Sequence, residues 1–263
     1  PQTPNPKPQT PNPKPQCICI DYFLQTMQVD FSESINYQDV LDDSDKEPIK
    51  SFQYHGKDDS IFYEYVMSPF CQWVVDNILP EKLAPNMITL IGLSFIAIPH
   101  VLIMTLYPDE KSIPHRLFYL MSALGTLLYS IFDNLDGKQA RKRAQASPLG
   151  MLFDHGCDSL NSFLNAMIIA RLFLISRELQ GIAVALVACA FYFATLEQYF
   201  TDYFYLPRVN SVNEGIMFLV FIKLLAFVFG GQIFRETAFG IIQWNHLVLI
   251  ILIVSAVTTC LGK

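Results

Sequence analysis

Long apolar segments alternate with short polar ones in the chain after residue 86. Each apolar run is close to the ~20 residues that a helix needs to cross a bilayer, and the runs cover residues 87–107, 117–132, 149–176, 181–200, 215–230 and about 239–261. Spanning helices are apolar on nearly every side, so length and the bounding polar loops decide these assignments, not periodicity. The pattern predicts an all-α fold, a polytopic membrane helix bundle with about six transmembrane helices.

The segment that precedes these runs, residues 60–79, has a different pattern. Its apolar residues recur at helical spacing, with acidic and amide side chains between them. It is too polar to span a membrane and aromatic enough to lie in the interface, which predicts an amphipathic surface helix. Pro69 is expected to kink it. We assign residues 50–85 to this interfacial segment; an ordinary helix packed on the bundle is the plainer alternative, and both can hold.

Residues 1–49 lack the composition of a folded core. Residues 1–16 repeat the motif Pro-Gln-Thr-Pro-Asn-Pro-Lys, which favours extended polyproline geometry and predicts disorder. Residues 20–58 are polar and acidic, as expected of a solvated lead-in that faces the cytosol. The predicted transmembrane domain then covers residues 86–263.

Charge and cysteine content narrow the function classes. The net charge is −6 and no extended basic face is visible, which argues against nucleic-acid binding. The six cysteines lack the spacing of a metal site. A basic stretch, residues 138–143, is expected to form the loop between the second and third spans, and the positive-inside rule puts that loop in the cytosol.

Acidic residues gather around this basic stretch. Asp133 and Asp136 are three residues apart and share a helix face, while Asp154 and Asp158 are four apart on the next helix. Ser147-Pro148 suits the N-cap and first position of that next helix. We therefore expect two antiparallel neighbouring helices whose carboxylates converge. Ionisable groups at membrane depth are costly, so such a cluster marks a functional site by default.

The chemistry of the cluster favours metal-assisted phosphoryl transfer. Packed carboxylates need a cation, and oxygen ligands select Mg²⁺ or Mn²⁺ over zinc. Four of them suit a two-metal site with ions ~3.5–4 Å apart. Arg141 is the natural partner for a substrate phosphate. His155 is suited to accept a proton from an alcohol; Asp158 competes for that role, but a metal-bound carboxylate is less basic, which favours His155.

Weaker signals lie near this cluster or deeper in the apolar runs. Asn86 is placed to cap the first run. Asn161 and Asn165 continue the polar face of the third run, either to line a substrate groove or to bond between helices. Glu197 and Lys223 are expected to pair or to extend to the interface, not to take part in catalysis. Small residues keep the backbone bare for close approach of a helix or ligand, at Gly137, Ala140 and Gly150.

The spacing of the cluster resembles the signature of the CDP-alcohol phosphotransferases, Asp-x₂-Asp-Gly-x₂-Ala-Arg-x₈-Gly-x₃-Asp-x₃-Asp. Its fixed positions are met by Asp133, Asp136, Gly137, Ala140, Arg141, Gly150, Asp154 and Asp158. The surrounding stretches, including residues 147–159 and 196–215, resemble the eukaryotic choline and ethanolamine phosphotransferases. The resemblance covers about residues 50–230.

This resemblance implies a helix bundle around a binuclear Mg²⁺ or Mn²⁺ site that is open to the cytosol, in the endoplasmic reticulum or Golgi membrane. It assigns the four aspartates to the metals, His155 to the proton and three residues to the CDP moiety, namely Asn86, Gly137 and Arg141. The substrates would be CDP-ethanolamine or CDP-choline and diacylglycerol. The products would be CMP and phosphatidylethanolamine or phosphatidylcholine.

Other readings stay open at this point. A CDP-diacylglycerol-dependent phosphatidyltransferase with an inositol or glycerophosphate acceptor is the runner-up. An ion channel or transporter would also carry intramembrane acids, although the motif's place at one membrane end argues against it. Relatives of the resembled family usually continue through further helices, so this chain is either truncated, a short form or an inactive regulatory partner. Homodimer contacts are left open for the same reason.

Overall fold

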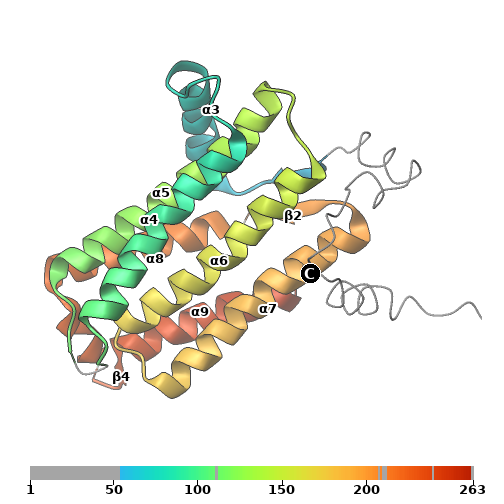
Figure 1. Ribbon diagram of the computed structural model, residues 1–263. Helices are drawn as coiled ribbons and strands as arrows, with labels where there is room; N and C mark the ends of the chain where they lie inside the picture. The colour runs from blue at the N-terminus through green and yellow to red at the C-terminus, as the bar shows by residue number, and fades with distance from the viewer. Residues whose placement is uncertain (1–53, 110–111, 207, 209–211, 239, 262–263) are drawn as a thin grey trace, which may run out of the picture. The chain divides into compact units, whose positions relative to one another are not determined.

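Six long helices make up most of the part of the chain that the structure describes (Figure 1). They are α4 (Pro85–Leu106), α5 (Arg116–Lys142), α6 (Pro148–Leu172), α7 (Arg177–Thr201), α8 (Val212–Phe229) and α9 (Trp244–Leu261). The structure is a computed structural model that describes residues 54–261 with gaps at 110–111, 207, 209–211 and 239. The predictions for residues 1–49 lie outside the described residues. Each predicted apolar run corresponds to one long helix, with differences at the ends, which confirms the all-α bundle.

The helices differ in how well they suit a membrane. Three of them, α4, α7 and α8, are long and apolar enough to cross one by length and composition, and α9 has a shorter apolar stretch, Trp244–Thr258. The remaining two, α5 and α6, carry the charged residues of the predicted site. The chain is thus an integral membrane protein built of helices, and the total of six spans stays a prediction.

Close packing of α4 on α5 forms the largest helix contact in the bundle. A side-chain carbon added at Gly125 would collide with the carbonyl oxygen of Phe95, and one at Gly92 would lie 2.8 Å from Cβ of Phe132. These glycines, one on each helix, therefore allow the backbones to approach. Close approach was expected at Gly137, Ala140 and Gly150, and the pair of Gly92 and Gly125 was not predicted.

The partners of α5 are not quite those expected from the sequence. The helix packs mainly against α4 and α8, and α4 also packs against α6. Although only residues 143–147 separate α5 from α6, the two helices touch much less than α5 and α4 do. The acidic cluster lies where α5 and α6 face each other with little apolar contact, which leaves room for a pocket.

The basic stretch after the acids is mostly helical, contrary to the expected loop. Lys138, Arg141 and Lys142 lie in α5, and only Arg143 follows it. A hydrogen bond to a neighbouring helix supports this helical end: the Lys142 ammonium donates to the carbonyl oxygen of Val75 at 2.8 Å. That carbonyl lies near the end of α3 (Ser68–Asn77), where a cation also complements the helix dipole. Membrane orientation stays a prediction.

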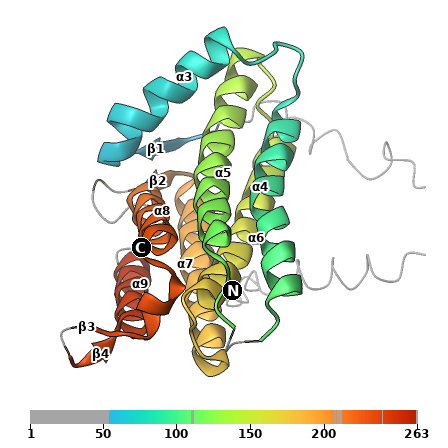
Figure 2. The ribbon, with the colours of Figure 1, turned by 90° about the vertical axis from the view of Figure 1, so that its left-hand side faces the viewer.

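The segment before the bundle combines a strand with a helix (Figure 2). Strand β1 (Gly56–Asp58) pairs in parallel with β2 (Phe204–Leu206), with Gly56 opposite Phe204. Helical structure then runs through the π-helical turn η1 (Tyr63–Met67) into α3. Pro69 is the second residue of α3 and follows directly on the π-helical turn, so the helical hydrogen bonding is irregular where its N–H is missing. The kink expected at Pro69 stays a prediction. Figure 2 shows β1, β2 and α3 at the same end of the bundle.

Both faces of α3 match the amphipathic pattern. Cys71 and Val75 are fully buried in a cluster with Ile88 and Leu135 of the bundle. The aromatic side chains of Phe70 and Trp73 are exposed, as is Tyr65 in the preceding turn η1. The helix packs on the bundle and also presents an apolar face, and the placement of that face in the membrane interface stays a prediction.

The chain before α9 makes a short irregular connection. It consists of the 3₁₀ helix η2 (Gly231–Arg235) and a small antiparallel pair, β3 (Thr237–Ala238) and β4 (Ile242–Gln243). The sixth apolar run was expected to begin at about residue 239, and its helix begins at Trp244.

Candidate metal and active site

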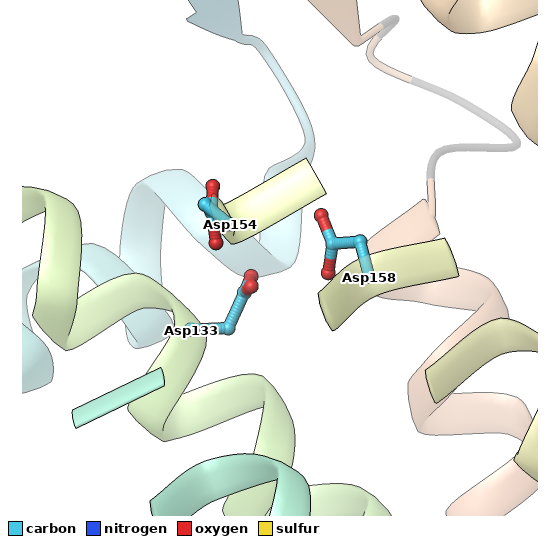
Figure 3. A group of neighbouring side chains, drawn as sticks. All are labelled: Asp133, Asp154 and Asp158. Atoms are coloured by element: carbon cyan, nitrogen blue, oxygen red, sulfur yellow. The ribbon is translucent and has the colours of Figure 1, made fainter. Parts of the chain in front are cut away.

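Three aspartates from two helices converge on one point (Figure 3). Asp133 comes from α5, and Asp154 and Asp158 come from successive turns of α6. One carboxylate oxygen from each lies within 4.8 Å of the others. Figure 3 shows the three side chains pointing toward a common space. The predicted convergence of these three carboxylates is thus what the structure has.

The fourth aspartate lies beside this group of three. Asp136 is one turn after Asp133 on α5, is buried, and accepts a hydrogen bond from the Thr89 hydroxyl of α4. It lines the same pocket as the other three. Thr89 was not singled out from the sequence, and its only signal there is its position one turn after Asn86 in an apolar run.

Asp158 has a partner that the sequence analysis also missed. The Tyr129 hydroxyl of α5 donates a hydrogen bond of 2.8 Å to a carboxylate oxygen of Asp158. Tyr129 precedes Asp133 by four residues, so both lie on one face of α5. That spacing was the available signal, but tyrosine in an apolar run reads first as a packing residue.

The remaining carboxylate oxygens show that the cluster fits a divalent cation. One oxygen of Asp133 and one of Asp154 are buried without a hydrogen-bond partner among the described residues. Buried carboxylate oxygens are normally paired, because an unpaired one loses its hydration with nothing in return. The donor set is made only of oxygens, which suits hard cations such as Mg²⁺ or Mn²⁺. The cluster therefore has the ligands that such a cation needs.

The cluster opens into a pocket of about 1180 Å³. The predicted ligand-binding residues Asn86, Gly137 and Arg141 all line it, and so does His155. Its size exceeds that of a typical small-molecule site, so it has room for a nucleotide together with a second substrate. Arg141 lies along the bare backbone of Gly137, at 3.6 Å from where a side-chain carbon would stand.

Two helix starts frame the pocket, one as expected and one not. At α6 the Ser147 hydroxyl accepts a hydrogen bond of 3.1 Å from the amide of Gly150, which confirms the predicted cap. At α4 the cap position is held by Ala84 with Pro85 next, so the expected cap at Asn86 is wrong. The fixed φ of proline suits the first helical position and starts the helix two residues earlier than expected. The side chain of Asn86 is left to the pocket.

The N-terminal strand contributes residues that the sequence did not indicate. Tyr54, Lys57 and Asp58 line the pocket, as does Phe204 of β2. Burial, with the nearby Asp154 carboxylate, raises the pKa of Tyr54 to about 12. These residues reach the site because β1 pairs with a strand far along the chain, which no local pattern predicts.

Asp58 also ties this strand to α8. Its carboxylate accepts hydrogen bonds from the amide of Ser60 at 2.8 Å and from the side-chain amide of Asn213 at 2.6 Å. Burial raises the pKa of Asp58, and the backbone amide of Ser60 opposes that shift. The strand that lines the pocket is therefore fixed at one end to the first turn of α8.

Lys223, one of the two weaker charged positions, behaves differently from the expectation. Lys223 neither reaches the interface nor pairs with Glu197 in the contacts that the structure describes. It is fully buried, and its ammonium donates to Thr126 and Asn165. Polar acceptors from α5 and α6 thus bind its ammonium inside the bundle.

Comparisons with known proteins agree with this architecture. Residues 82–256 match the family model for CDP-alcohol phosphatidyltransferases. Choline/ethanolaminephosphotransferase 1 of Saccharomyces cerevisiae is 35% identical over 201 residues, covering 74% of this chain and 50% of the relative. Choline/ethanolaminephosphotransferase 1 of Arabidopsis thaliana is 38% identical over 172 residues, covering 65% and 43%.

A relative whose name gives a different activity is similar to this chain to about the same degree. The CDP-diacylglycerol–serine O-phosphatidyltransferase of Encephalitozoon cuniculi is 35% identical over 190 residues, covering 72% of this chain and 49% of the relative. The chain spans about half the length of the curated relatives it matches.

Proposed function

This chain belongs to the CDP-alcohol phosphatidyltransferase family, and from that membership we propose that it transfers phosphoethanolamine or phosphocholine from the CDP-alcohol to diacylglycerol. The products would be CMP and phosphatidylethanolamine or phosphatidylcholine. The observation that carries this proposal is the convergence of Asp133, Asp154 and Asp158 on one point, with buried oxygens that have no other partner among the described residues.

In this proposal the four aspartates hold two divalent cations, Mg²⁺ or Mn²⁺. Asp133, Asp154 and Asp158 supply the converging oxygens, and Asp136 supplies a carboxylate one helical turn away. When bound, such cations neutralise the charge that develops on phosphate oxygens during transfer. Tyr129 and Thr89 orient two of the carboxylates by hydrogen bonds, as outer partners of metal ligands commonly do.

The CDP moiety would occupy the polar end of the pocket. Arg141 presents a planar cation to the pyrophosphate, which pairs well with phosphate oxygens. The bare backbone of Gly137 and the side chain of Asn86 face the same space. These groups bind the donor and fix its phosphorus near the carboxylate cluster.

The transfer step moves one phosphoryl bond and one proton. The acceptor hydroxyl oxygen forms a bond to the phosphorus that carries the alcohol headgroup, the bond from that phosphorus to the CMP oxygen breaks, and CMP leaves with the electron pair. His155 takes the hydroxyl proton. Asp158 is the weaker candidate for that role, because one of its oxygens already accepts a hydrogen bond from Tyr129.

A second candidate function has a specific observation behind it. The similarity to the Encephalitozoon serine phosphatidyltransferase favours a reaction in which CDP-diacylglycerol is the donor and a small alcohol such as serine the acceptor. An inositol or glycerophosphate acceptor belongs to the same alternative. The carboxylate cluster and Arg141 would act alike in both, so the pocket that receives the second substrate must distinguish them.

The proposed setting is the endoplasmic reticulum or Golgi membrane, with the pocket facing the cytosol. Charged residues at the end of α5 and the polar pocket lining support an aqueous opening at that end of the bundle. Homodimerisation stays a prediction from family resemblance.

The test is CMP release by the purified chain in liposomes with Mg²⁺. Wild type with CDP-ethanolamine or CDP-choline and diacylglycerol should release CMP, and Asp133→Asn should lower the rate at least about a hundredfold because a charged metal ligand is lost. Asp202→Asn is the matched control, because that carboxylate is 97% exposed. Release only with CDP-diacylglycerol and serine would favour the second candidate, and full activity of Asp133→Asn would refute both.

A further inference from the structure

The proton acceptor of the proposed reaction, His155, needs a fixed ring direction. A general base works when its nitrogen lies about 2.6–3.2 Å from the atom that gives up the proton. An error of about 1 Å in such a placement can cost on the order of a hundredfold in rate. The torsion that turns an imidazole ring has broad minima, so the ring does not keep one direction by itself. A neighbouring group must therefore hold it.

The usual device for this purpose is a hydrogen bond to the second ring nitrogen. Catalytic histidines are commonly oriented by a carboxylate or carbonyl oxygen that accepts from the nitrogen that takes no part in the reaction. Among the described residues the ring of His155 has no hydrogen bond or ion pair. Its direction must depend on another kind of contact.

That contact is with an aromatic ring. The ring of Phe204 in β2 is centred 5.9 Å from the imidazole of His155, with an angle of 42° between the two planes. Ring pairs at about 4.5–7 Å attract each other in preferred relative orientations, so each ring of such a pair restricts the other. Both side chains line the pocket. The contact thus links helix α6 to a strand that follows α7, at the place where the proton is to be taken.

The backbone of Phe204 is itself held by hydrogen bonds. Its amide donates to the carbonyl oxygen of His55 at 2.9 Å, and the residue stands opposite Gly56 in the parallel pair of β1 and β2. The strand β1 is tied in turn to α8, because the side chain of Asn213 donates to Asp58 at 2.6 Å. Side chains on paired strands are placed more accurately than side chains on loops. Phe204 therefore presents its ring from a fixed position.

We propose that Phe204 is a positioning residue of the proposed reaction, whose ring holds the imidazole of His155 in the direction from which it takes the proton of the acceptor hydroxyl. Phe204 acts only through His155. This inference rests on the proposed function, because it takes His155 as the proton acceptor. A plain pocket wall that contacts substrate is the other role for a phenylalanine at this place, and the two roles predict different kinetics.

Loss of the ring should lower kcat and leave substrate affinity almost unchanged. Phe204→Leu keeps an apolar side chain on the strand without the ring. In liposomes with Mg²⁺, diacylglycerol and CDP-ethanolamine or CDP-choline, its kcat should fall about tenfold while the KM for each substrate stays within about twofold. Phe204→Tyr keeps the ring and should keep kcat within about twofold. A higher KM with unchanged kcat in Phe204→Leu, or an equal fall of kcat in Phe204→Tyr, would overturn the inference.

Phe200→Leu is the matched control for this substitution. Phe200 also pairs with a ring, that of Tyr199 at 5.3 Å, but it is exposed and lies outside the pocket lining. The same chemical change there should leave kcat and KM within about twofold of wild type. A fall of kcat in Phe200→Leu as large as in Phe204→Leu would show a general effect on the fold, and the inference would fail.

A measurement without turnover separates this inference from the proposed function. Diethyl pyrocarbonate modifies imidazole nitrogens, and mass spectrometry of the full-length chain after digestion gives the rate at each histidine. In Phe204→Leu, His155 should react about threefold faster than in wild type, because one side of its ring is uncovered. Phe204→Tyr should react like wild type at His155, and the exposed His115 should keep its rate in every variant.

The outcomes distinguish the two ideas. Faster modification of His155 in Phe204→Leu, in a preparation whose wild type releases no CMP, would defeat the proposed function and support Phe204 as the group that holds the imidazole. Normal CMP release by wild type, together with equal rates at His155 in wild type and Phe204→Leu, would overturn the inference and leave the proposed function intact.

Discussion

Two polar clusters lie in the same helix bundle and differ in how their hydrogen bonds are satisfied. The carboxylate cluster of Asp133, Asp154 and Asp158 offers only acceptors, and two of its buried oxygens have no partner among the described residues. In the deeper network, the Lys223 ammonium donates to Thr126 and Asn165, and the Thr126 hydroxyl donates to Asn165, so donors and acceptors from three helices lie together. The first has a deficit of positive charge and opens to a pocket; the second carries its own cation and is closed.

This difference teaches how to separate a binding centre from an interhelical brace when both are polar. Counting polar residues in apolar runs does not distinguish them. The balance of donors and acceptors does, because a set of acceptors alone requires an external cation, whereas a mixed set can satisfy itself.

The largest effect is expected on metal affinity, when a side chain that hydrogen-bonds to the carboxylate cluster is changed. We call this cluster of Asp133, Asp154 and Asp158 the open cluster, and the network of Lys223, Thr126 and Asn165 the closed network. Tyr129→Phe removes the hydroxyl that donates to Asp158. We expect the Mg²⁺ concentration for half-maximal CMP release to rise about 10- to 100-fold, as for other outer partners of metal ligands. A metal titration of the rate measures this, and Mn²⁺ binding measures it without turnover.

Tyr119→Phe is the matched control for that substitution. Tyr119 is also a buried tyrosine of α5, but its hydroxyl donates to the carbonyl of Leu172 at 2.9 Å, away from the carboxylates. It should lose about 1 kcal/mol of stability with no change in metal affinity. Equal metal affinity in Tyr129→Phe and wild type would show that Asp158 needs no such partner.

Much of the open cluster could be predicted because its signals are local. Spacings of three and four residues put carboxylates on one helix face, and Ser147 with Pro148 marks a helix start. The start of α4 was predicted two residues late, because Asn86 competes with Pro85 as a boundary signal and proline prevails.

What the sequence could not give depends on contacts between distant segments. The pairing of Gly56 with Phe204 brings Tyr54 and Lys57 to the pocket, and neither local pattern nor composition indicates that strand pair. The inward turn of Lys223 likewise depends on acceptors from α5 and α6, which exist only once the bundle has formed. An apolar run with one lysine reads equally well as a helix with a cation at the interface.

An intermediate effect is expected on stability when the closed network is broken. Thr126→Val keeps the shape of the side chain but removes an acceptor of Lys223. The ammonium is then left buried with one acceptor among the described residues, which should lower the free energy of unfolding by about 1 to 2 kcal/mol. Reversible denaturation in mixed micelles measures it.

Thr105→Val provides the comparison for that measurement. The Thr105 hydroxyl bonds only to the carbonyl of Val101 in its own helix and is exposed. The same chemical change there should alter stability by less than about 0.5 kcal/mol. If Thr126→Val were as mild, Lys223 would have to be satisfied in another way and the contrast between the clusters would weaken.

The smallest effect is expected at the strand that lines the pocket. Tyr54→Phe removes one neutral hydroxyl from the pocket, so the KM for the CDP-alcohol should rise about threefold. Burial raises the pKa of Tyr54 to about 12, and the phenol therefore keeps its proton as pH rises, losing it only near that value. The rate profile between about pH 6 and 10 should thus have the same shape in Tyr54→Phe and wild type.

Tyr203→Phe, on an exposed side chain outside the pocket, should change neither the KM nor the shape of the rate profile. A change in the wild-type rate between about pH 9 and 10 that is absent from Tyr54→Phe would contradict this expectation. It would mean that the phenol is far better solvated than its burial implies, and that β1 does not cover the pocket in the membrane.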